Sequence, residues 1–327
     1  MTRDAKILRE LYAVGDTGIS GAALANRLGV SRAAIWARIE ELRRAGFDIE
    51  ASPHAGYRLT ATPDRLIGDD LIARLAPTKR IGRSIQVFQE TKSTNESVER
   101  LGRDGCEEGA IVMAESQTAG RGRLGRSWEA TSGKGILMSV LLRPPMKPTE
   151  VTRLTVIGAL AVVRALQRTV SLEAAIKWPN DVVIGYRKLA GILTEMNAEP
   201  DRVRYLVLGM GVNVNQSRGD WPDALTAIAT SVNLEQGVLI DRSALATAII
   251  EELDHAYNRV LEGDFRSVAS EWETRCSTLG KEVSVQFGKD CIVGVAESID
   301  HEGALLLRTS SGQLTRITGG DVSLNRR

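Results

Sequence analysis

Residues 116–128, SQTAGRGRLGRSW, are the stretch that decides the fold class. Gly120, Gly122 and Gly125 match the dinucleotide-binding fingerprint G-x-G-x-x-G, so a nicotinamide or flavin enzyme is one candidate. That fingerprint has to open a helix whose N-terminus holds the pyrophosphate. Here residues 128–134 are typical of a loop, and residues 135–142 are typical of another strand. The glycine-rich segment therefore connects two strands, which argues against a doubly wound dinucleotide-binding sheet.

Three arginines, Arg121, Arg123 and Arg126, alternate with these glycines. A guanidinium binds a phosphate or a carboxylate through two parallel hydrogen bonds, so this segment can neutralise an anion through side chains as well as through the backbone. We expect a loop that is mobile when empty and that an anionic ligand orders. A generic arginine- and glycine-rich contact with nucleic acid is the alternative interpretation. The chain contains no Walker A motif.

A second polar motif lies just before this segment. Residues 84–90 have the pattern of a strand, and the motif STN at residues 93–95 then opens a helix. Ser93 and Glu96 match a capping box, which explains both residues structurally. A helix N-terminus that follows a strand is also a favourable place for a carboxylate or a polar ring. The local sequence leaves both interpretations open.

Residues 176–193 predict a hairpin that carries two lysines, in the motifs KWPND (177–181) and KLAGIL (188–193). Asn180 and Asp181 follow a proline turn and could serve only as backbone caps. Lys188 lies among Leu189, Ile192 and Leu193. Burial of an unpaired ammonium group is costly, so we expect Lys188 to reach solvent or to meet the negative charge of a ligand.

Residues 205–210 predict a strand that leads into GMGVNVN at residues 209–215. Its first two glycines allow a flat ligand to approach the backbone, and Asn213 offers the donor and acceptor that an adenine-like edge requires. Residues 149–168 predict a long apolar helix. Because the hairpins imply antiparallel pairing, we predict an α+β central region with a mixed or antiparallel sheet and helices.

The first 62 residues predict a winged helix-turn-helix, with helices over 4–14, 20–28 and 32–45 and a hairpin of strands 47–51 and 56–59. Ser31 is a natural N-cap for the third helix, whose first turn would enter the DNA major groove. This region has nine basic and seven acidic residues, a weak footprint for a DNA binder, so a helical domain that only packs or binds protein is the alternative. The predicted DNA-binding residues are Ser31, Arg32, Ala33 and Trp36, with Arg43, Arg44 and Arg58 near phosphates. Trp36 is atypical for base contacts and could instead be packed.

The C-terminal region predicts helices over 241–261 and 264–276, followed by short strands over 282–287, 291–298, 304–308 and 314–317. Such strands with short turns favour a small SH3-like β-barrel. The expected domains are therefore 1–62, a winged helix; 63–276, a catalytic domain; and 277–327, the barrel.

The overall composition is that of an ordinary globular protein. The 327 residues are 43% hydrophobic, and 42 basic against 41 acidic residues give a net charge of +1, so no global field recruits nucleic acid or a membrane. The polar residues 1–10 and the short apolar runs predict a cytoplasmic protein without membrane spans. Three scattered cysteines and three scattered histidines argue against a disulfide framework and against a protein-bound metal site.

The motifs STN, QTAGRGRLGR, KWPND, KLAGIL and GxGxNV occur in this order behind a winged helix. As a set, they resemble the bifunctional biotin protein ligase and biotin operon repressor family. The resemblance implies a class II synthetase-like ligase domain with biotin, ATP and Mg²⁺ as cofactors. It implies that biotin's carboxylate attacks the α-phosphate of ATP and that an acceptor lysine then displaces AMP. The implied partners are the biotin carboxyl carrier protein of acetyl-CoA carboxylase, operator DNA and a second copy in a ligand-promoted homodimer.

The resemblance also implies residue roles. Lys188 and Arg123 take the catalytic positions. The biotin-binding positions are Ser93, Thr94, Asn95, Gln117, Arg121, Arg123, Lys188, Gly191, Gly209 and Gly211. The positions for ATP or the adenylate are Arg123, Arg126, Trp128, Lys177, Asn180, Asp181 and Asn213, with Trp128 stacked on adenine. The family's C-terminal arginine falls at or beside Asn325, and Arg326 is its possible replacement.

Two other functions remain as rivals. A lipoate ligase would share the central fold and the adenylation chemistry, but it would lack the winged helix, the arginine loop and the C-terminal barrel. A transcription factor alone would leave the cationic loop and both lysines unused.

Overall fold

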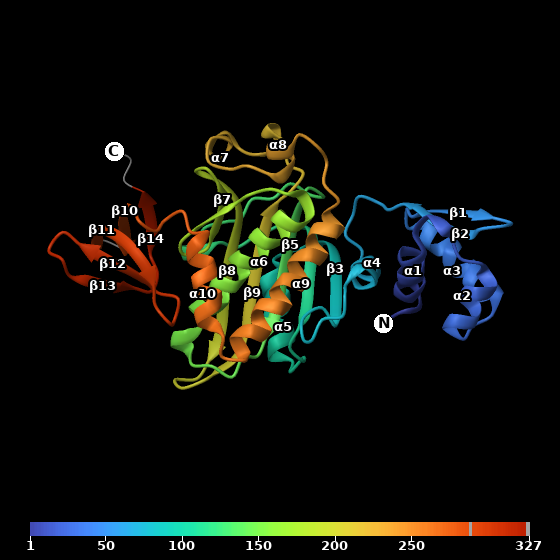
Figure 1. The fold of residues 1–327 in the computed structure, drawn as a ribbon, viewed down its shortest axis with the longest axis horizontal. Helices are drawn as coiled ribbons and strands as arrows, with labels where there is room; N and C mark the ends of the chain where they lie inside the picture. Colours follow the sequence, from blue (N-terminus) through green and yellow to red (C-terminus); the bar gives the residue numbers. More distant parts are fainter. Residues whose placement is uncertain (288–289, 325–327) are drawn as a thin grey trace.

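The computed structural model describes residues 1–287 and 290–324. Figure 1 shows three parts in a row: a small N-terminal unit, a central sheet with its helices, and a C-terminal sheet at the opposite end. None of the helices within the described ranges is long and apolar enough to cross a membrane.

The N-terminal unit has the predicted helix-turn-helix with a hairpin wing. Thr2, Ser20 and Ser31 each accept a hydrogen bond from a backbone N–H three residues on, so each of the three helices begins at a side-chain N-cap. Leu8, Leu24 and Ile39 are among the fully buried residues between them. The elements are α1 (Arg3–Val14), α2 (Gly21–Leu28), α3 (Arg32–Arg44), β1 (Asp48–Ser52) and β2 (Gly56–Ala61).

The central sheet has seven strands in the order β3-β4-β5-β9-β8-β7-β6. Only β3 and β4 are parallel, so the predicted mixed sheet is confirmed and a doubly wound sheet is excluded. β9 continues through residues 209–213, further than the predicted end at residue 210, because this stretch pairs with both β5 and β8. The strands are β3 (Ser84–Thr91), β4 (Ala110–Gln117), β5 (Gly135–Leu142), β6 (Ala175–Lys177), β7 (Asp181–Ile184), β8 (Arg187–Ala198) and β9 (Val203–Asn213).

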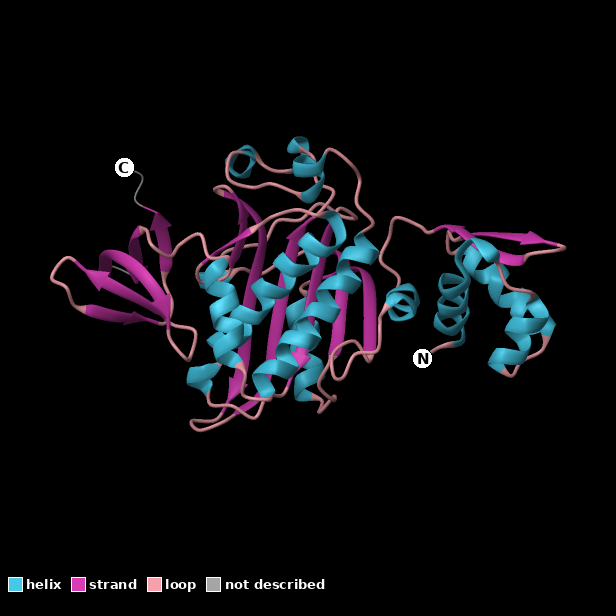
Figure 2. Cartoon of the chain, viewed as in Figure 1, coloured by secondary structure: helices cyan, strands magenta, loops and turns pink. Residues whose placement is uncertain are grey.

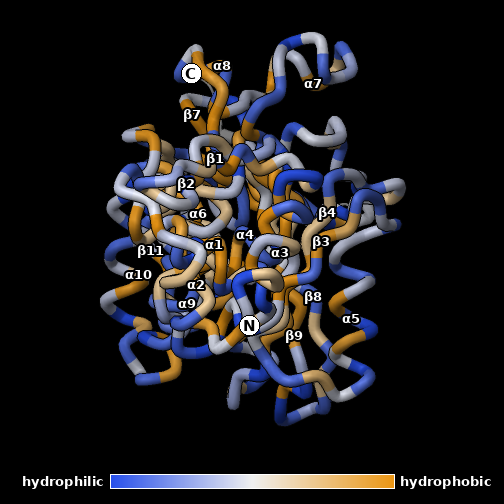
Figure 3. The backbone as a smooth tube through the Cα atoms, turned by 90° about the vertical axis from the view of Figure 1, so that its right-hand side faces the viewer, coloured by the Kyte–Doolittle hydropathy of each residue, from blue (hydrophilic) through white to orange (hydrophobic). Residues whose placement is uncertain are grey.

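Helices cover both faces of this sheet (Figures 2 and 3). Val98 of α5 (Thr94–Arg103) packs with Val112 and Val207 on one face. On the other face, α6 (Thr152–Val170) and α9 (Arg242–Leu261) enclose the main core, and α10 (Phe265–Thr274) packs on both. Figure 3 shows hydrophobic residues recurring along the central strands, with many hydrophilic residues in the outer loops.

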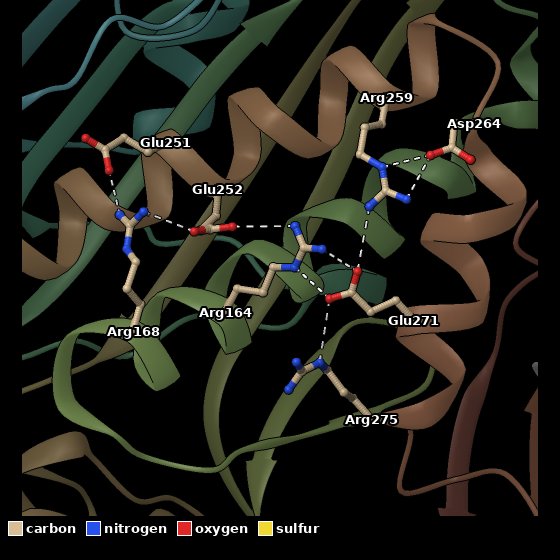
Figure 4. A network of polar contacts seen from close by, with 8 residues as sticks. All are labelled: Arg164, Arg168, Glu251, Glu252, Arg259, Asp264, Glu271 and Arg275. Carbon is tan, nitrogen blue, oxygen red and sulfur yellow. Dashed lines mark hydrogen bonds and ion pairs between the residues drawn. The ribbon is translucent and has the colours of Figure 1, made fainter.

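An ion-pair network fastens α6, α9 and α10 to one another (Figure 4). Glu271 of α10 accepts two hydrogen bonds from Arg164 of α6, and Glu252 of α9 pairs with both Arg164 and Arg168. Arg259 and Arg275 complete the network around Glu271. Because shared charges couple several helices, this layer is a firm support behind the sheet.

A buried ion pair holds the segment after the winged helix on the sheet. Arg242 and Glu115 are 1% and 5% exposed, and their Nη1 and Oε2 atoms lie 2.6 Å apart. The backbone N–H of Leu66 donates to the same carboxylate, and Arg242 donates to the carbonyl of Asp64. Residues 64–66 are therefore anchored just before α4 (Gly68–Arg74).

The C-terminal sheet has five antiparallel strands in the order β13-β12-β11-β10-β14. Its two end strands do not pair with each other within residues 290–324, so a closed SH3-like barrel is not confirmed. The sequence left open whether Arg326 replaces the family's C-terminal arginine at Asn325, and both positions lie outside the described residues. The strands are β10 (Glu282–Phe287), β11 (Asp290–Ile299), β12 (Leu305–Thr309), β13 (Leu314–Ile317) and β14 (Asp321–Leu324), and two short helices, α7 (Asp223–Thr226) and α8 (Val232–Gln236), precede α9.

Candidate functional site

Two adjoining cavities lie at the central sheet, and Trp128 and Lys188 line both of them. We call the first the sheet cavity, because strands and the start of α5 form most of it. Its walls are Ser93, Thr94, Asn95, Gln117, Arg121, Gly122, Arg123, Trp128, Leu137, Asn180, Lys188, Gly191, Ile192, Leu193, Gly209, Met210 and Gly211. We call the second the loop cavity. Its walls are Arg126, Ser127, Trp128, Glu129, Lys177, Asp181, Val183, Tyr186, Lys188, Asn213, Trp221, Pro222, Leu225, Ile228 and Ala229.

The start of α5 is held by Gln117, not by a capping box. Gln117 lies at the end of β4, and its Oε1 accepts hydrogen bonds from the backbone N–H of Thr94 at 2.7 Å and from Thr94 Oγ1 at 3.0 Å. Ser93 accepts no capping hydrogen bond. The predicted Ser93–Glu96 box is therefore wrong, because a side chain from the neighbouring strand satisfies the helix N-terminus instead.

Behind Thr94, a buried serine completes a polar network. Ser139 on β5 is fully buried, and its Oγ lies 2.7 Å from Thr94 Oγ1 and 2.6 Å from Asn95 Oδ1. Asn95 Nδ2 in turn donates to Glu195 Oε2 at 2.6 Å. These bonds fix Thr94 and Asn95 before any ligand arrives, so the polar end of the sheet cavity is preorganised.

Three glycines give this cavity its shape. A Cβ atom at Gly209 would lie 2.1 Å from Asn95 Oδ1, and one at Gly211 would lie 2.5 Å from Trp128 Cε2. At Gly191 a Cβ would come within 2.9 Å of the same indole. Glycine is therefore required at these positions so that Asn95 and Trp128 can lie directly against the backbone.

The three arginines of the loop differ in their partners. Arg121 Nη1 lies 3.3 Å from Glu195 Oε1, and Arg126 pairs with Asp321 of β14. Arg123 donates to Asn180 Oδ1 at 3.1 Å but forms no ion pair with the residues described. Burial lowers the pKa of the Arg123 guanidinium, and the negative charges of Asp181 and Asp321 offset only part of this effect. Arg123 is thus the loop cation best prepared for an anionic ligand.

Lys188 has an internal counter-ion. Its Nζ lies 2.7 Å from Asp181 Oδ1 and 5.4 Å from the centroid of the Trp128 ring. The Lys188 side chain is 37% exposed, so it reaches solvent as expected, and Asp181 of the neighbouring strand also compensates its charge. Its backbone N–H donates to the carbonyl of Ile228 at 2.7 Å, which ties the wall of the loop cavity to β8.

The ring of Trp128 forms the partition between the cavities. It lies against Gly191 and Gly211, the glycines predicted for biotin, while also lining the cavity that contains the residues predicted for ATP. Its Nε1 is buried and has no hydrogen-bond partner among the described atoms. A buried donor without a partner is unfavourable, so an acceptor that reached this nitrogen would be stabilised.

In the loop cavity, Asn213 is 4% exposed and donates through Nδ2 to the carbonyl of Thr230 at 3.0 Å. Part of its predicted capacity to bind an adenine edge is therefore already used. Within residues 1–287 and 290–324, no group of three or more His, Cys, Asp or Glu side chains could hold a metal ion.

Every residue predicted for biotin or ATP lines one of the two cavities, but the sequence did not indicate two polar side chains behind the sheet cavity or one wall of the loop cavity. Ser139 is the one polar side chain in the apolar run 136–142, which is the signal that could have identified it. Glu195 follows KLAGIL by two positions and had no comparable signal. The missed wall of the loop cavity comes from residues 221–229, where only the pair Trp221-Pro222 stands out.

The predicted DNA-binding residues Ser31, Arg32, Ala33 and Trp36 are all exposed at the start of α3. Trp36 is 60% exposed, so the alternative that it is packed is wrong. Two of the arginines expected near phosphates have internal partners: Arg43 donates to the carbonyl of Ile49, and Arg58 pairs with Glu50. They are less available to DNA than Arg32 and Arg44.

Comparison with known proteins gives a consistent result over nearly the whole chain. The model of the biotin/lipoate A/B protein ligase family matches residues 87–213, an HTH domain matches residues 3–58, and the biotin protein ligase C-terminal domain matches residues 278–325. The bifunctional ligase/repressor BirA of Bacillus subtilis is 37% identical over 98% of each chain, and that of Escherichia coli is 31% identical over 93% of this chain and 92% of its own.

The solved structures agree with the sequence comparisons. The biotin protein ligase of Aquifex aeolicus in complex with biotin and ATP has a TM-score of 0.64 and 29% identity, and the match covers 75% of this chain and all of that one. The resemblance found from the motifs is therefore confirmed. The chain belongs to the bifunctional biotin ligase/repressor family and is a biotin protein ligase.

Proposed function

We propose that biotin binds in the sheet cavity and ATP in the loop cavity, and that the two react beside Lys188. The observation that carries this proposal is that Lys188 and Trp128 are the two residues that line both cavities. A carboxylate that enters from one side and a phosphate that enters from the other would meet at this lysine. The buried, unpartnered Nε1 of Trp128 points to an acceptor at the same place.

The polar end of the sheet cavity suits the neutral ureido ring of biotin. Thr94 and Gln117 line this end of the cavity, Ser139 supports Thr94 from behind, and Gly209 lets Asn95 lie against the backbone. The carboxylate of biotin would then extend past Trp128 toward Lys188 and Arg123. Ser93, Gly191 and Gly211 complete the proposed biotin walls.

In the first step, a biotin carboxylate oxygen attacks the α-phosphorus of ATP, and the bond from that phosphorus to the bridging oxygen breaks. Pyrophosphate leaves, and biotinyl-5′-adenylate remains. Negative charge accumulates on the phosphoryl oxygens, so Lys188 and Arg123 stabilise the transition state more than the reactants. Asp181 holds Lys188 in place until the phosphate replaces Asp181 as the partner of the ammonium group.

In the second step, the amine of an acceptor lysine attacks the acyl carbon, and the bond to the adenylate oxygen breaks, which releases AMP. We propose that the acceptor is the biotin carboxyl carrier protein of acetyl-CoA carboxylase. The relative of Mycobacterium tuberculosis, 34% identical over 249 residues, carries the name biotin–[acetyl-CoA-carboxylase] ligase.

The nucleotide would lie among Lys177, Asp181 and Asn213 of the loop cavity, with Trp221 and Ile228 against the base. Asn180, which lines the adjoining sheet cavity, would face its phosphates. Mg²⁺ is typically bound by one or two carboxylates together with substrate phosphates. Asp181 and Glu129 are the carboxylates that line the loop cavity, so they fit this role. The ion would neutralise charge on the triphosphate.

The proposed acceptor is tested by incubating the protein with biotin, Mg²⁺, ATP and a carrier domain, and then measuring the mass of the carrier. We expect one biotinyl group on one lysine, and none when either biotin or ATP is omitted. A carrier that stays unmodified under the complete conditions would contradict the proposal.

We further propose that the exposed start of α3 binds operator DNA as part of a homodimer that biotinyl-adenylate favours. The HTH match and the exposure of Arg32 and Trp36 support the DNA contact. A single unit with nine basic and seven acidic residues is a weak binder, so two linked units would bind a palindromic site much better. Sedimentation with and without biotin and ATP, followed by a gel shift on DNA upstream of biotin-synthesis genes, tests this role. Unchanged association and unchanged DNA affinity would contradict it and leave the ligase function intact.

A further inference from the structure

Glu195 on β8 joins two separate parts of the sheet cavity. Its Oε2 accepts a hydrogen bond from Asn95 Nδ2 at 2.6 Å, and its Oε1 lies 3.3 Å from Arg121 Nη1. Asn95 belongs to the start of α5, whereas Arg121 belongs to the arginine loop. A single carboxylate thus connects the floor of the cavity to the loop that borders it.

The amide of Asn95 is engaged on both sides. Its Oδ1 lies 2.6 Å from Ser139 Oγ, its Nδ2 donates to Glu195, and its side chain is 5% exposed against Gly209. Such an amide cannot turn toward a ligand without leaving a buried group unsatisfied. Asn95 therefore acts as a fixed spacer, and Glu195 is one of the two groups that hold it.

Arg121 is a cation whose charge is already compensated. Besides Glu195, the carboxylate of Glu96 lies 3.6 Å from its Nη2. Arg121 also lines a surface groove together with Glu195 and Glu99, so its guanidinium forms the boundary between the sheet cavity and that groove. A compensated guanidinium suits a neutral ring, whereas the unpaired Arg123 suits an anion.

We propose that Glu195 is a positioning residue for the ring end of biotin, because its carboxylate holds Asn95 against Gly209 and Arg121 across the boundary of the sheet cavity. This inference rests on the proposed binding of the biotin ring in that cavity. It extends the binding site to a side chain that does not line the cavity itself.

The test measures biotin affinity by calorimetry, together with the KM for biotin, the KM for ATP and kcat. Glu195→Gln keeps an oxygen that can accept from Asn95 but removes the charge beside Arg121. Since a partly exposed ion pair contributes little, we expect about a threefold weaker affinity for biotin. Glu195→Ala also removes the charged acceptor of a buried amide, and we expect a loss of about tenfold or more. In both variants the KM for biotin should change more than kcat, and the KM for ATP should stay constant.

Glu99→Gln is the matched control, because Glu99 lines the same groove but pairs with Arg103. We expect wild-type affinity for biotin in this variant. A second measurement places Glu195→Gln in an Arg121→Ala background. If Glu195 acts through Arg121, the effect of the glutamine should disappear there.

The outcomes separate the two proposals. If the wild-type protein binds no biotin, the proposed function fails. If the wild-type protein binds biotin and Glu195→Ala binds it equally well, this inference is wrong and the proposed function stands. Equal changes in the KM for biotin and the KM for ATP would also overturn it, because a general loss of structure would affect both cavities. Melting curves of each variant identify such a loss.

Discussion

The sheet cavity and the loop cavity differ in how their walls are held. In the sheet cavity, the polar side chains bond to one another: Gln117 to Thr94, Ser139 to Thr94 and Asn95, and Asn95 to Glu195. In the loop cavity, much of the wall is an apolar set from the segment 221–229, which includes the short helix α7 and in which Ile228 is 54% exposed. One cavity is a preorganised polar site, and the other is a broad surface for a planar group with phosphates attached.

The difference separates recognition from chemistry. A neutral ring needs directional hydrogen bonds that exist before binding, because each unsatisfied buried group would otherwise reduce affinity. A nucleotide brings its own charge, so cations and an apolar face are sufficient for it. Lys188 belongs to both cavities, and variants can therefore be sorted by the side whose ligand they affect.

The largest expected effect is that of Lys188→Ala, which removes the cation that lines both cavities. Loss of a preorganised cation at the developing charge should slow adenylate formation by about 2–4 kcal/mol in barrier height. Rapid-quench measurement of adenylate formation checks this value, and the affinity for biotin should change far less. Lys147→Ala, at an exposed lysine away from both cavities, should behave as wild type. Near wild-type formation in Lys188→Ala would remove Lys188 from the catalytic role.

Arg123→Gly should mainly affect retention of the product. The loop cation without an ion pair closes over a finished anion, so a charged hydrogen bond of about 1.5–3 kcal/mol would be lost and the adenylate would escape at least tenfold faster. Released adenylate should then label lysines of a bystander protein, as measured by mass spectrometry. Arg202→Gly, at a surface arginine paired with Glu199, is the control. Bystander labelling that does not exceed the wild-type level would argue against a retaining role.

Ser139→Ala should weaken the binding of biotin without affecting that of ATP. The change leaves Asn95 Oδ1 buried without its donor, which costs about 1–3 kcal/mol, so we expect roughly a tenfold loss of affinity for biotin. The KM for ATP should not change, because Ser139 does not line the loop cavity. Ser84→Ala on the exposed start of β3 is the control. An equal change in the affinity for biotin and in the KM for ATP would contradict the assignment of the two ligands to separate cavities.

The smallest expected effect is that of Trp221→Ala, which should weaken the binding of ATP without affecting that of biotin. Loss of an aromatic wall of about 0.5–1.5 kcal/mol predicts a rise of roughly three- to tenfold in the KM for ATP. Calorimetry should show unchanged binding of biotin. Leu239→Ala, in the same part of the chain and 76% exposed, should leave both ligands unaffected. A selective loss of biotin affinity in Trp221→Ala would reverse the assignment of the two cavities.

The same contrast explains how far the sequence could be interpreted. The mixed sheet and the winged helix follow from local patterns, because strands and helices carry their own signals. The roles of the motif residues in the sheet cavity follow from the resemblance to a known family. The pairing of Lys188 with Asp181 and the capping of α5 by Gln117 depend on neighbouring strands, which no local pattern specifies. Residues 221–229 have no regular periodicity, so most of that wall had no sequence signal. The closed barrel failed because alternation predicts strands but not whether the end strands pair.

The central claim is that two cavities share one reacting position, and pyrophosphate exchange tests it most directly. The protein is incubated with ATP, Mg²⁺ and labelled pyrophosphate, with and without biotin, and without any acceptor. We predict label in ATP only when biotin is present, because pyrophosphate is released and recaptured only if a carboxylate from the sheet cavity reaches the α-phosphorus. Exchange without biotin, or no exchange with it, would contradict the account.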